Sequence, residues 1–127
     1  MFVRRILSGH FFSWSVLLKQ KSRQTSQINT NPQAAAFLAK TMADENRLRI
    51  IYALADGKKP VSRIVEELGI SQPLASHHLK ELKRSLLVTV ERRGPFVYYE
   101  LADQRIIEIL LSLNGLAEDL LANRTTF

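Results

Sequence analysis

The sequence contains no cysteine, and this absence excludes several kinds of chemistry. Disulfide frameworks, thiolate metal sites and cysteine nucleophiles all require that residue. Histidine is scarce as well, with only three, at positions 10, 77 and 78. Neighbouring residues on a helix point about 100° apart, so His77 and His78 do not easily close one metal site. A metalloenzyme is therefore disfavoured, and the lack of cysteine favours a cytoplasmic location.

Acidic residues are missing from the start of the chain. Residues 1–43 carry six basic side chains and no Asp or Glu, so they account for the whole formal charge of +6. Residues 44–127 are balanced, with 12 basic and 12 acidic side chains. A nucleic-acid-binding surface in that part therefore has to be a local cluster of charge.

Long hydrophobic runs are also absent. The stretch Ile6–Leu18 is interrupted by Ser, Gly and His, and a membrane span needs about 20 mostly apolar residues, so we expect no transmembrane helix. Three interpretations of residues 1–30 remain open. In the first, this basic arm is a poorly ordered extension from an early translation start. In the second, it is an amphipathic helix that packs on the domain or its partner, and in the third it is an acid-free targeting peptide.

Residues 31–122 have the pattern of one mainly α-helical domain with a small β-hairpin, followed by a tail at 123–127. Capping residues and apolar spacing predict five helices, over 32–42, 45–56, 61–68, 72–85 and 103–121. Asp44 and Ser71 are the predicted N-caps of the second and fourth helices, and Gly69 is predicted to end the third helix in the left-handed conformation. Two strands rich in β-branched and aromatic residues are predicted at 88–93 and 96–101, and Gly94-Pro95 joins them in a type II′ turn.

The apolar positions of three helices predict how these helices pack. In the second helix the buried face is expected to hold Leu48, Ile51, Tyr52 and Ala55, and in the fourth helix Ala75, Leu79, Leu82 and Leu86. The last helix is apolar on more than one side. One side completes the core, and the other needs a partner.

A helix, a glycine turn, a second helix and a hairpin, in this order, are typical of a winged helix-turn-helix. Gly69 permits the tight turn, and burial of Ala75 and Leu79 leaves polar side chains outside. Those outward side chains are Gln72, Ser76, His77, Lys80 and Lys83. Gln pairs with adenine and Lys neutralises phosphate, so this surface is suited to DNA. The net charge is +3 over 71–93 and −3 over 103–121. The fourth helix and the hairpin are therefore suited to DNA by their charge, and the last helix is not.

Three stretches, 40–51, 65–82 and 92–101, resemble the ArsR/SmtB family of bacterial and archaeal transcriptional repressors. The resemblance extends over about residues 34–121. It implies a homodimeric repressor that binds an inverted-repeat operator in double-stranded DNA and leaves it when a signal is sensed.

The resemblance also implies roles for particular residues. By position, it puts Ser71, Gln72, Ser76 and His77 on the recognition helix, and Arg92 and Arg93 on the wing. The outward-facing Lys80 is expected to join them at the DNA. It puts the dimer interface on the first and last helices, where we expect Leu38, Ile106, Leu110, Leu113 and Ala117 to take part.

The chain departs from the family where metals are sensed. Metal-responsive members use cysteines before the turn, or an Asp-x-His pair at the start of the last helix, and here Asp103 is followed by Arg105. A cation at that place repels a metal ion, so we expect no metal and no cofactor. The sequence does not indicate an effector.

Other interpretations remain open. The chain is alternatively a winged-helix module for protein contact, a repressor controlled by a small organic ligand or a partner protein, or a monomeric helical bundle. An enzyme has the weakest case, because no nucleophile–base pair, phosphate loop or paired carboxylates stand at a recognisable spacing.

Overall fold

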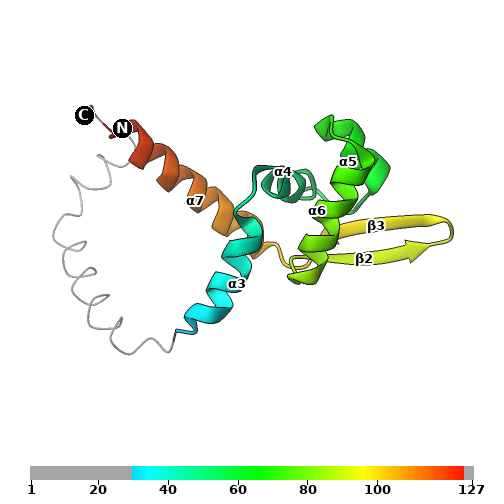
Figure 1. Ribbon diagram of the computed structural model, residues 1–127, viewed down its shortest axis with the longest axis horizontal. Helices are drawn as coiled ribbons and strands as arrows, with labels where there is room; N and C mark the ends of the chain where they lie inside the picture. Colours follow the sequence, from blue (N-terminus) through cyan, green and yellow to red (C-terminus); the bar gives the residue numbers. More distant parts are fainter. Residues whose placement is uncertain (1–29, 125–127) are drawn as a thin grey trace. The chain divides into compact units, whose positions relative to one another are not determined.

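The computed structural model describes residues 30–124, and those from Gln33 onward belong to one compact unit. Its elements follow the order α3 (Pro32–Met42), α4 (Glu45–Ala53), β1 (Lys59–Pro60), α5 (Val61–Leu68), α6 (Gln72–Arg84), β2 (Val88–Arg93), β3 (Phe96–Leu101) and α7 (Arg105–Ala122) (Figure 1). The predicted mainly α fold with a wing is confirmed. Residues 1–29 and 125–127 lie outside the described part, and with them nearly all of the predicted arm and most of the tail.

Local chemistry sets where three of the helices begin or end. The carboxylate of Asp44 accepts the backbone N–H of Arg47 at 3.0 Å and caps α4, and the hydroxyl of Ser71 accepts the N–H of Leu74 at 3.3 Å and caps α6. Gly69 ends α5 with φ = 63° and ψ = 32°, the left-handed conformation that glycine adopts without a Cβ clash. These three predictions are confirmed.

Helix α4 is shorter than predicted and has a different buried face. It ends at Ala53 rather than at residue 56, with Leu54 as its C-cap, so Gly57 lies beyond the helix. Tyr52 and Ala55, predicted to be buried, are exposed. Ile50 and Leu54 are buried beside Ile51 instead, because the inward face of the helix is rotated from the one that the spacing indicated.

The end of α6 corrects a second prediction. Leu86 was expected in the buried stripe, but it is 76% exposed, and Leu87 is buried in its place. The N–H of Leu87 bonds to the carbonyl of Leu82, and the N–H of Leu86 to that of Lys83, which together form a Schellman motif. Because Leu86 takes a left-handed φ of 66°, the helical periodicity stops before it.

The sheet has a third strand that the sequence analysis missed. Its order is β1-β3-β2, antiparallel throughout, and β1 pairs Lys59 with Tyr99 and Pro60 with Tyr98. The predicted hairpin of β2 and β3 is confirmed at both strands, with Val88 opposite Leu101 and Arg93 opposite Phe96. Gly94 has φ = 60°, the sign that the first central residue of a type II′ turn requires.

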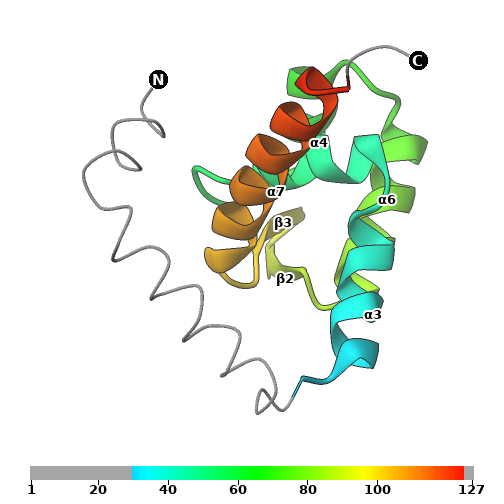
Figure 2. The ribbon, with the colours of Figure 1, turned by 90° about the vertical axis from the view of Figure 1, so that its left-hand side faces the viewer.

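The core joins the helices to the base of the hairpin. Its residues are Ile50, Ile51, Leu54, Ile64, Leu79, Leu82, Leu87, Val88, Leu101, Ile106 and Leu110. Helix α7 contributes only its first two turns, because every residue from Leu111 to Arg124 is exposed. Helices α3 and α7 lie at the opposite end of the unit from the wing tip and face the viewer in Figure 2. In the described part, no helix meets the length and apolarity that crossing a membrane requires.

Candidate nucleic-acid interface

Helices α5 and α6 form the helix-turn-helix, and α6 divides sharply into two faces. Ala75, Leu79 and Leu82 are completely buried on its inner face. The predicted residues of its outer face are all exposed: Ser71, Gln72, Ser76, His77, Lys80 and Lys83. At about 100° per residue, Gln72, Ser76, Lys80 and Lys83 share an arc of about 80°, and His77 lies about 60° further round. The helix therefore presents amide, hydroxyl and ammonium groups together.

The cations of α6 differ in their availability. Arg84 is paired with Glu81 at 3.1 Å, within one turn of the same helix. No carboxylate of the described residues pairs with Lys80 or Lys83. Because an exposed ion pair reduces the charge that a helix offers to phosphate, Lys80 and Lys83 are the stronger candidates for phosphate contact.

The structure separates the two arginines of the wing, which the sequence analysis treated alike. Successive residues of a strand point to opposite faces, so Arg92 shares the face of Val97, and Arg93 shares that of Phe96. The Nε of Arg93 lies 2.7 Å from Oε1 of Glu91, whereas Arg92 has no carboxylate partner among residues 30–124.

Glu91 is held between two cations on the outer face of the wing. Lys58 donates a hydrogen bond to Oε2 of Glu91, and Arg93 donates to Oε1. These two bonds, that of Lys58 first, hold the pKa of Glu91 below its ordinary range. Glu91 is therefore ionised at neutral pH and compensates part of the positive charge near the tip of the wing.

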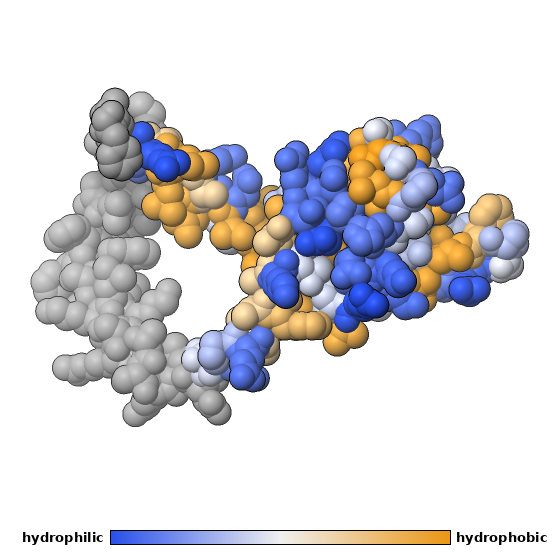
Figure 3. Space-filling model, viewed as in Figure 1, coloured by the Kyte–Doolittle hydropathy of each residue, from blue (hydrophilic) through white to orange (hydrophobic). Residues whose placement is uncertain are grey.

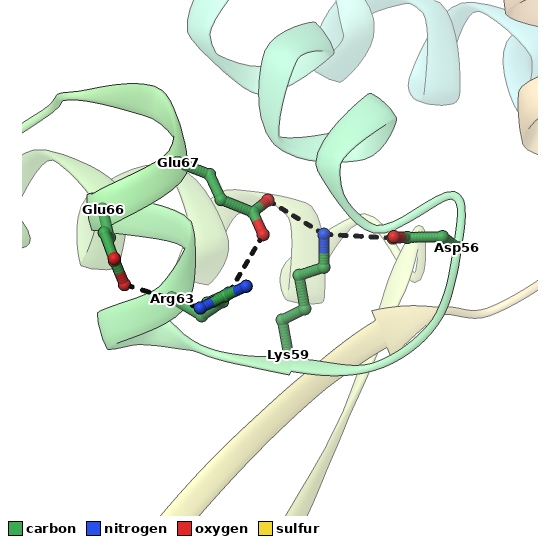
Figure 4. A network of polar contacts seen from close by, with 5 residues as sticks. All are labelled: Asp56, Lys59, Arg63, Glu66 and Glu67. Atoms are coloured by element: carbon green, nitrogen blue, oxygen red, sulfur yellow. Dashed lines mark hydrogen bonds and ion pairs between the residues drawn. The ribbon is translucent and has the colours of Figure 1, made fainter.

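A network of ion pairs connects β1 to the helix-turn-helix (Figure 4). The ammonium of Lys59 lies 2.9 Å from a carboxylate oxygen of Glu67 on α5 and 3.0 Å from one of Asp56. Arg63 extends the network to Glu66 at 3.8 Å and to Glu67 at 3.2 Å. The Lys59 side chain is only 15% exposed, and its bond to Glu67 raises the pKa of Lys59 and lowers that of Glu67. The network fixes the sheet of the wing against α5.

The predicted dimerisation residues fall into two groups. Ile106 and Leu110 are 7% and 1% exposed and belong to the core of the chain itself, so they are not open to a partner. Leu38, Leu113 and Ala117 are exposed. The sequence pattern indicated two apolar sides around α7. The structure adds a division along the length of the helix, because the stripe of Ile106, Leu110, Leu113 and Ala117 is covered by the core only over its first two turns.

The exposed half of this stripe continues into a groove between α3 and α7. The groove has a volume of about 490 Å³ and is lined by Ala35, Leu38, Ala39, Met42, Ala43, Leu48, Ile109 and Leu113. Apolar residues gather over α7 and the adjoining part of α3 (Figure 3). Phe37, Leu116, Leu120 and Leu121, each more than half exposed, add to this surface. An apolar surface of this kind typically marks a contact with another molecule.

The start of α7 carries the residues that the sequence analysis compared with a metal site. The guanidinium of Arg105 binds both carboxylate oxygens of Asp103, with a shortest distance of 2.7 Å. This pairing lowers the pKa of Asp103 to about 2. Within residues 30–124, no three His, Asp or Glu side chains converge in a way that holds a metal ion.

Two exposed apolar residues were missed by the sequence analysis. Phe96 is 58% exposed beside the turn of the wing, and Leu86 is 76% exposed at the end of α6. The position of Phe96 follows from the hairpin register, because the residue after the turn lies opposite Arg93. No sequence signal marks Leu86, since the left-handed position that it occupies is usually glycine.

A helix-turn-helix with an exposed, basic second helix beside a β-hairpin defines the winged helix-turn-helix class. A model of the bacterial regulatory proteins of the arsR family matches residues 44–90, which include α4, α5 and α6. The HTH-type transcriptional repressor SmtB of Mycobacterium tuberculosis is 40% identical over 78 residues, which cover 61% of this chain and 58% of SmtB. The chain thus spans just over half the length of that relative.

For two further relatives, the match includes a larger share of the relative's own length. The transcriptional activator HlyU of Vibrio cholerae is 32% identical over 96 residues, covering 73% of this chain and 89% of HlyU. A solved structure of HlyU superimposes with a TM-score of 0.62, at 34% identity, over 68% of this chain and 97% of that one. The homodimeric DNA-binding domain of a possible ArsR-family regulator from Mycobacterium bovis gives a TM-score of 0.64 at 25% identity, over 82% and 94% of the two chains.

These matches identify the family. The chain belongs to the ArsR family of transcriptional regulators, as the resemblance indicated. These relatives are regulators and not enzymes.

Proposed function

We propose that the protein is a transcriptional repressor that binds an inverted-repeat DNA operator as a homodimer in the cytoplasm. The observation that carries the proposal is the outer face of α6, where Gln72, Ser76, Lys80 and Lys83 are exposed together. Gln and Ser read base edges in the major groove, and unpaired Lys side chains neutralise phosphates. Ser71 and His77 lie at the margins of the same surface, and Arg92 and Arg93 extend it along the wing.

The dimer is supported by the apolar surface of α3 and α7. Leu38, Leu113 and Ala117 lie on it, and a second copy of the chain covers it through the same residues, as a two-fold symmetric interface requires. The M. bovis domain is described as homodimeric, which favours the same assembly here. Two recognition helices related by a two-fold axis explain why the operator is an inverted repeat.

Repression rather than activation is favoured by the likeness to SmtB, although HlyU is an activator. A repressor blocks transcription simply by covering a promoter, so it needs no activating surface. We also propose that metals do not control it, because Arg105 occupies the carboxylate of Asp103 and the chain has no cysteine.

A binding selection tests the proposal. Full-length protein is incubated with fragments of the source genome, bound fragments are sequenced, and affinity is measured by fluorescence anisotropy against a scrambled duplex. We expect recovery of an inverted repeat whose half-sites lie about one helical turn apart. Equal affinity for the operator and for the scrambled duplex would contradict sequence-specific binding and favour a winged helix used for protein contact.

A further inference from the structure

The tip of the wing combines positive charge with an unburied aromatic ring. Phe96 follows Gly94-Pro95, is 58% exposed and lies opposite Arg93. Its ring centroid is 6.4 Å from that of Tyr98, with the planes inclined by 54°, a supporting contact of the kind that aromatic pairs favour. The phenyl group is thus held from one side and open on the other.

We propose that Phe96 is an apolar wedge that enters the minor groove beside each half-site and partly unstacks one base step. This role rests on the proposed function, and it assigns to the wing a readout of DNA shape in addition to phosphate contact. Proteins that deform DNA insert Phe, Leu or Pro side chains between base steps from the minor groove.

The dimensions of the hairpin agree with this position. Val88 is buried in the core and Arg93 lies five residues further along β2, which corresponds to about 17 Å of strand. The major groove is about 12 Å wide, so a hairpin that starts beside the helix in that groove extends past the phosphate backbone. Helix α6 contacts β2 directly, which places the base of the hairpin beside the recognition helix.

The charges favour DNA over another protein as the occupant. Arg92 is without a carboxylate partner in the described part, and it lies within four residues of Phe96 on the opposite face of the hairpin. A narrow minor groove has enhanced negative potential that attracts arginine. Arg92 thus contacts the groove wall while Phe96 contacts the bases, and flexible TA or CA/TG steps are the ones that unstack most easily.

The test uses the full-length protein and a duplex selected by it from a random pool. A fluorescent adenine analogue replaces adenine at each step flanking the half-sites, and affinity is measured over several salt concentrations. We expect the wild-type protein to raise the fluorescence at one step per half-site. Phe96→Ala is expected to abolish this signal and to lower affinity about tenfold, with an unchanged salt slope because the net charge stays the same. Phe96→Leu, which keeps an apolar wedge, retains most of the signal.

Leu111→Ala is the matched control, because Leu111 is 59% exposed and lies far from the wing in sequence and on a different element. It is expected to leave both readouts unchanged. Wild-type affinity with unchanged fluorescence in Phe96→Ala would overturn the wedge and leave the proposed function intact. If Phe96→Ala instead dissociates the dimer in light scattering, Phe96 contacts the second copy and the wedge is wrong. Absence of any duplex preference in the wild-type protein would overturn both proposals.

Discussion

Nδ1 of His78 lies 3.9 Å from Oδ1 of Asp44, close enough for a charge interaction but too far for a hydrogen bond. The same Oδ1 accepts the N–H of Arg47, and in the described part Nδ1 of His78 is buried without a hydrogen-bond partner. Burial lowers the pKa of His78 below its ordinary value of 6.5, against the opposite effect of the Asp44 charge. The recognition helix therefore contains a neutral imidazole next to the cap of α4.

This arrangement predicts a pH dependence of stability. As pH falls through about 6.5, His78 gains a proton in the unfolded state, whereas the folded state resists protonation until lower pH. Since the unfolded state binds more protons in this range, the free energy of unfolding decreases as pH falls from about 7 towards 5. Arg47 and His77 oppose the charged form and Glu81 favours it, in addition to Asp44. Urea denaturation at several pH values measures the slope.

His78→Leu should remove this slope, while His77→Gln, at an exposed neighbouring position, should retain it. Asp44 does not account for the slope, because the N–H of Arg47 lowers the pKa of this carboxyl and confines its effect to more acidic pH. An identical slope in His78→Leu would assign the effect to another group.

The left-handed Leu86 predicts a stabilising substitution. A non-glycine residue in this conformation is strained by about 1–2 kcal/mol, so Leu86→Gly is expected to be about 1 kcal/mol more stable than Leu86→Ala. Both variants remove the leucine side chain, and their comparison thus isolates the backbone effect. Urea denaturation at one protein concentration gives the difference, and equal stability would contradict it.

The two parts of α7 are expected to have different roles: its first two turns stabilise the fold, and its exposed remainder forms the dimer. Glutamates at Leu113 and Leu116, both 54% exposed, should give a folded monomer, while Leu110→Glu should unfold the chain because Leu110 is buried. Light scattering reports the mass, and circular dichroism reports the helix content. Leu111→Glu lies outside the groove and should remain dimeric. A wild-type protein that is monomeric at micromolar concentration would contradict the proposed dimer.

On the DNA surface, base readout and phosphate contact should separate. Gln72→Ala is expected to relax discrimination at one base pair per half-site, at a cost of about 1–3 kcal/mol there. Arg92→Ala should weaken operator and scrambled duplexes alike and reduce the salt slope by about one for each phosphate that is no longer neutralised. Arg93→Ala should have a smaller effect on the slope, because Glu91 already compensates that charge. Anisotropy titrations at several salt concentrations measure all three variants.

If Gln72→Ala keeps its preference for the operator and Arg92→Ala loses that preference, base readout would have to be assigned to the wing rather than to α6. Lys83→Ala is a useful companion, since Lys83 lies on the same face of α6 as Gln72, about three turns further along, and its replacement removes charge without removing the amide.

Zinc, cadmium and nickel should not bind tightly. The carboxylate of Asp103 is bound by the guanidinium of Arg105, which lowers its pKa to about 2. It is therefore not available as a metal ligand. Isothermal calorimetry is expected to show no stoichiometric binding to the full-length protein. Nanomolar affinity that also lowers affinity for DNA would contradict this prediction.

The elements that the sequence predicted well are those set by local chemistry. The caps at Asp44 and Ser71, the left-handed Gly69 and the two strands of the wing depend on residues within a few positions of one another. The short strand β1 was missed because two residues that include a proline have no strand periodicity, and only pairing with distant β3 defines it.

Burial was harder to predict because it depends on where neighbouring elements end. Ile106 and Leu113 have the same apolar character and lie on one stripe of α7, yet only Ile106 is covered by the core. In the candidate interface, the residue types on α6 were predicted, whereas the different environments of Arg92 and Arg93 were not. Those environments arise from strand alternation and from Glu91 and Lys58, which lie 33 positions apart.

The central place of β3 in the sheet has a consequence for recognition. β3 is hydrogen-bonded to β2 on one side and to β1 on the other, and β1 leads without a break into α5. The wing is therefore not free to move independently of the helices. Tilting it would break the hydrogen bonds between β3 and β1, or would move α5 and α6 together with it. In the proposed complex, the recognition helix and the wing meet DNA as a preorganised surface. Little conformational entropy is then lost on binding, and a duplex with the wrong groove geometry gains little from induced fit.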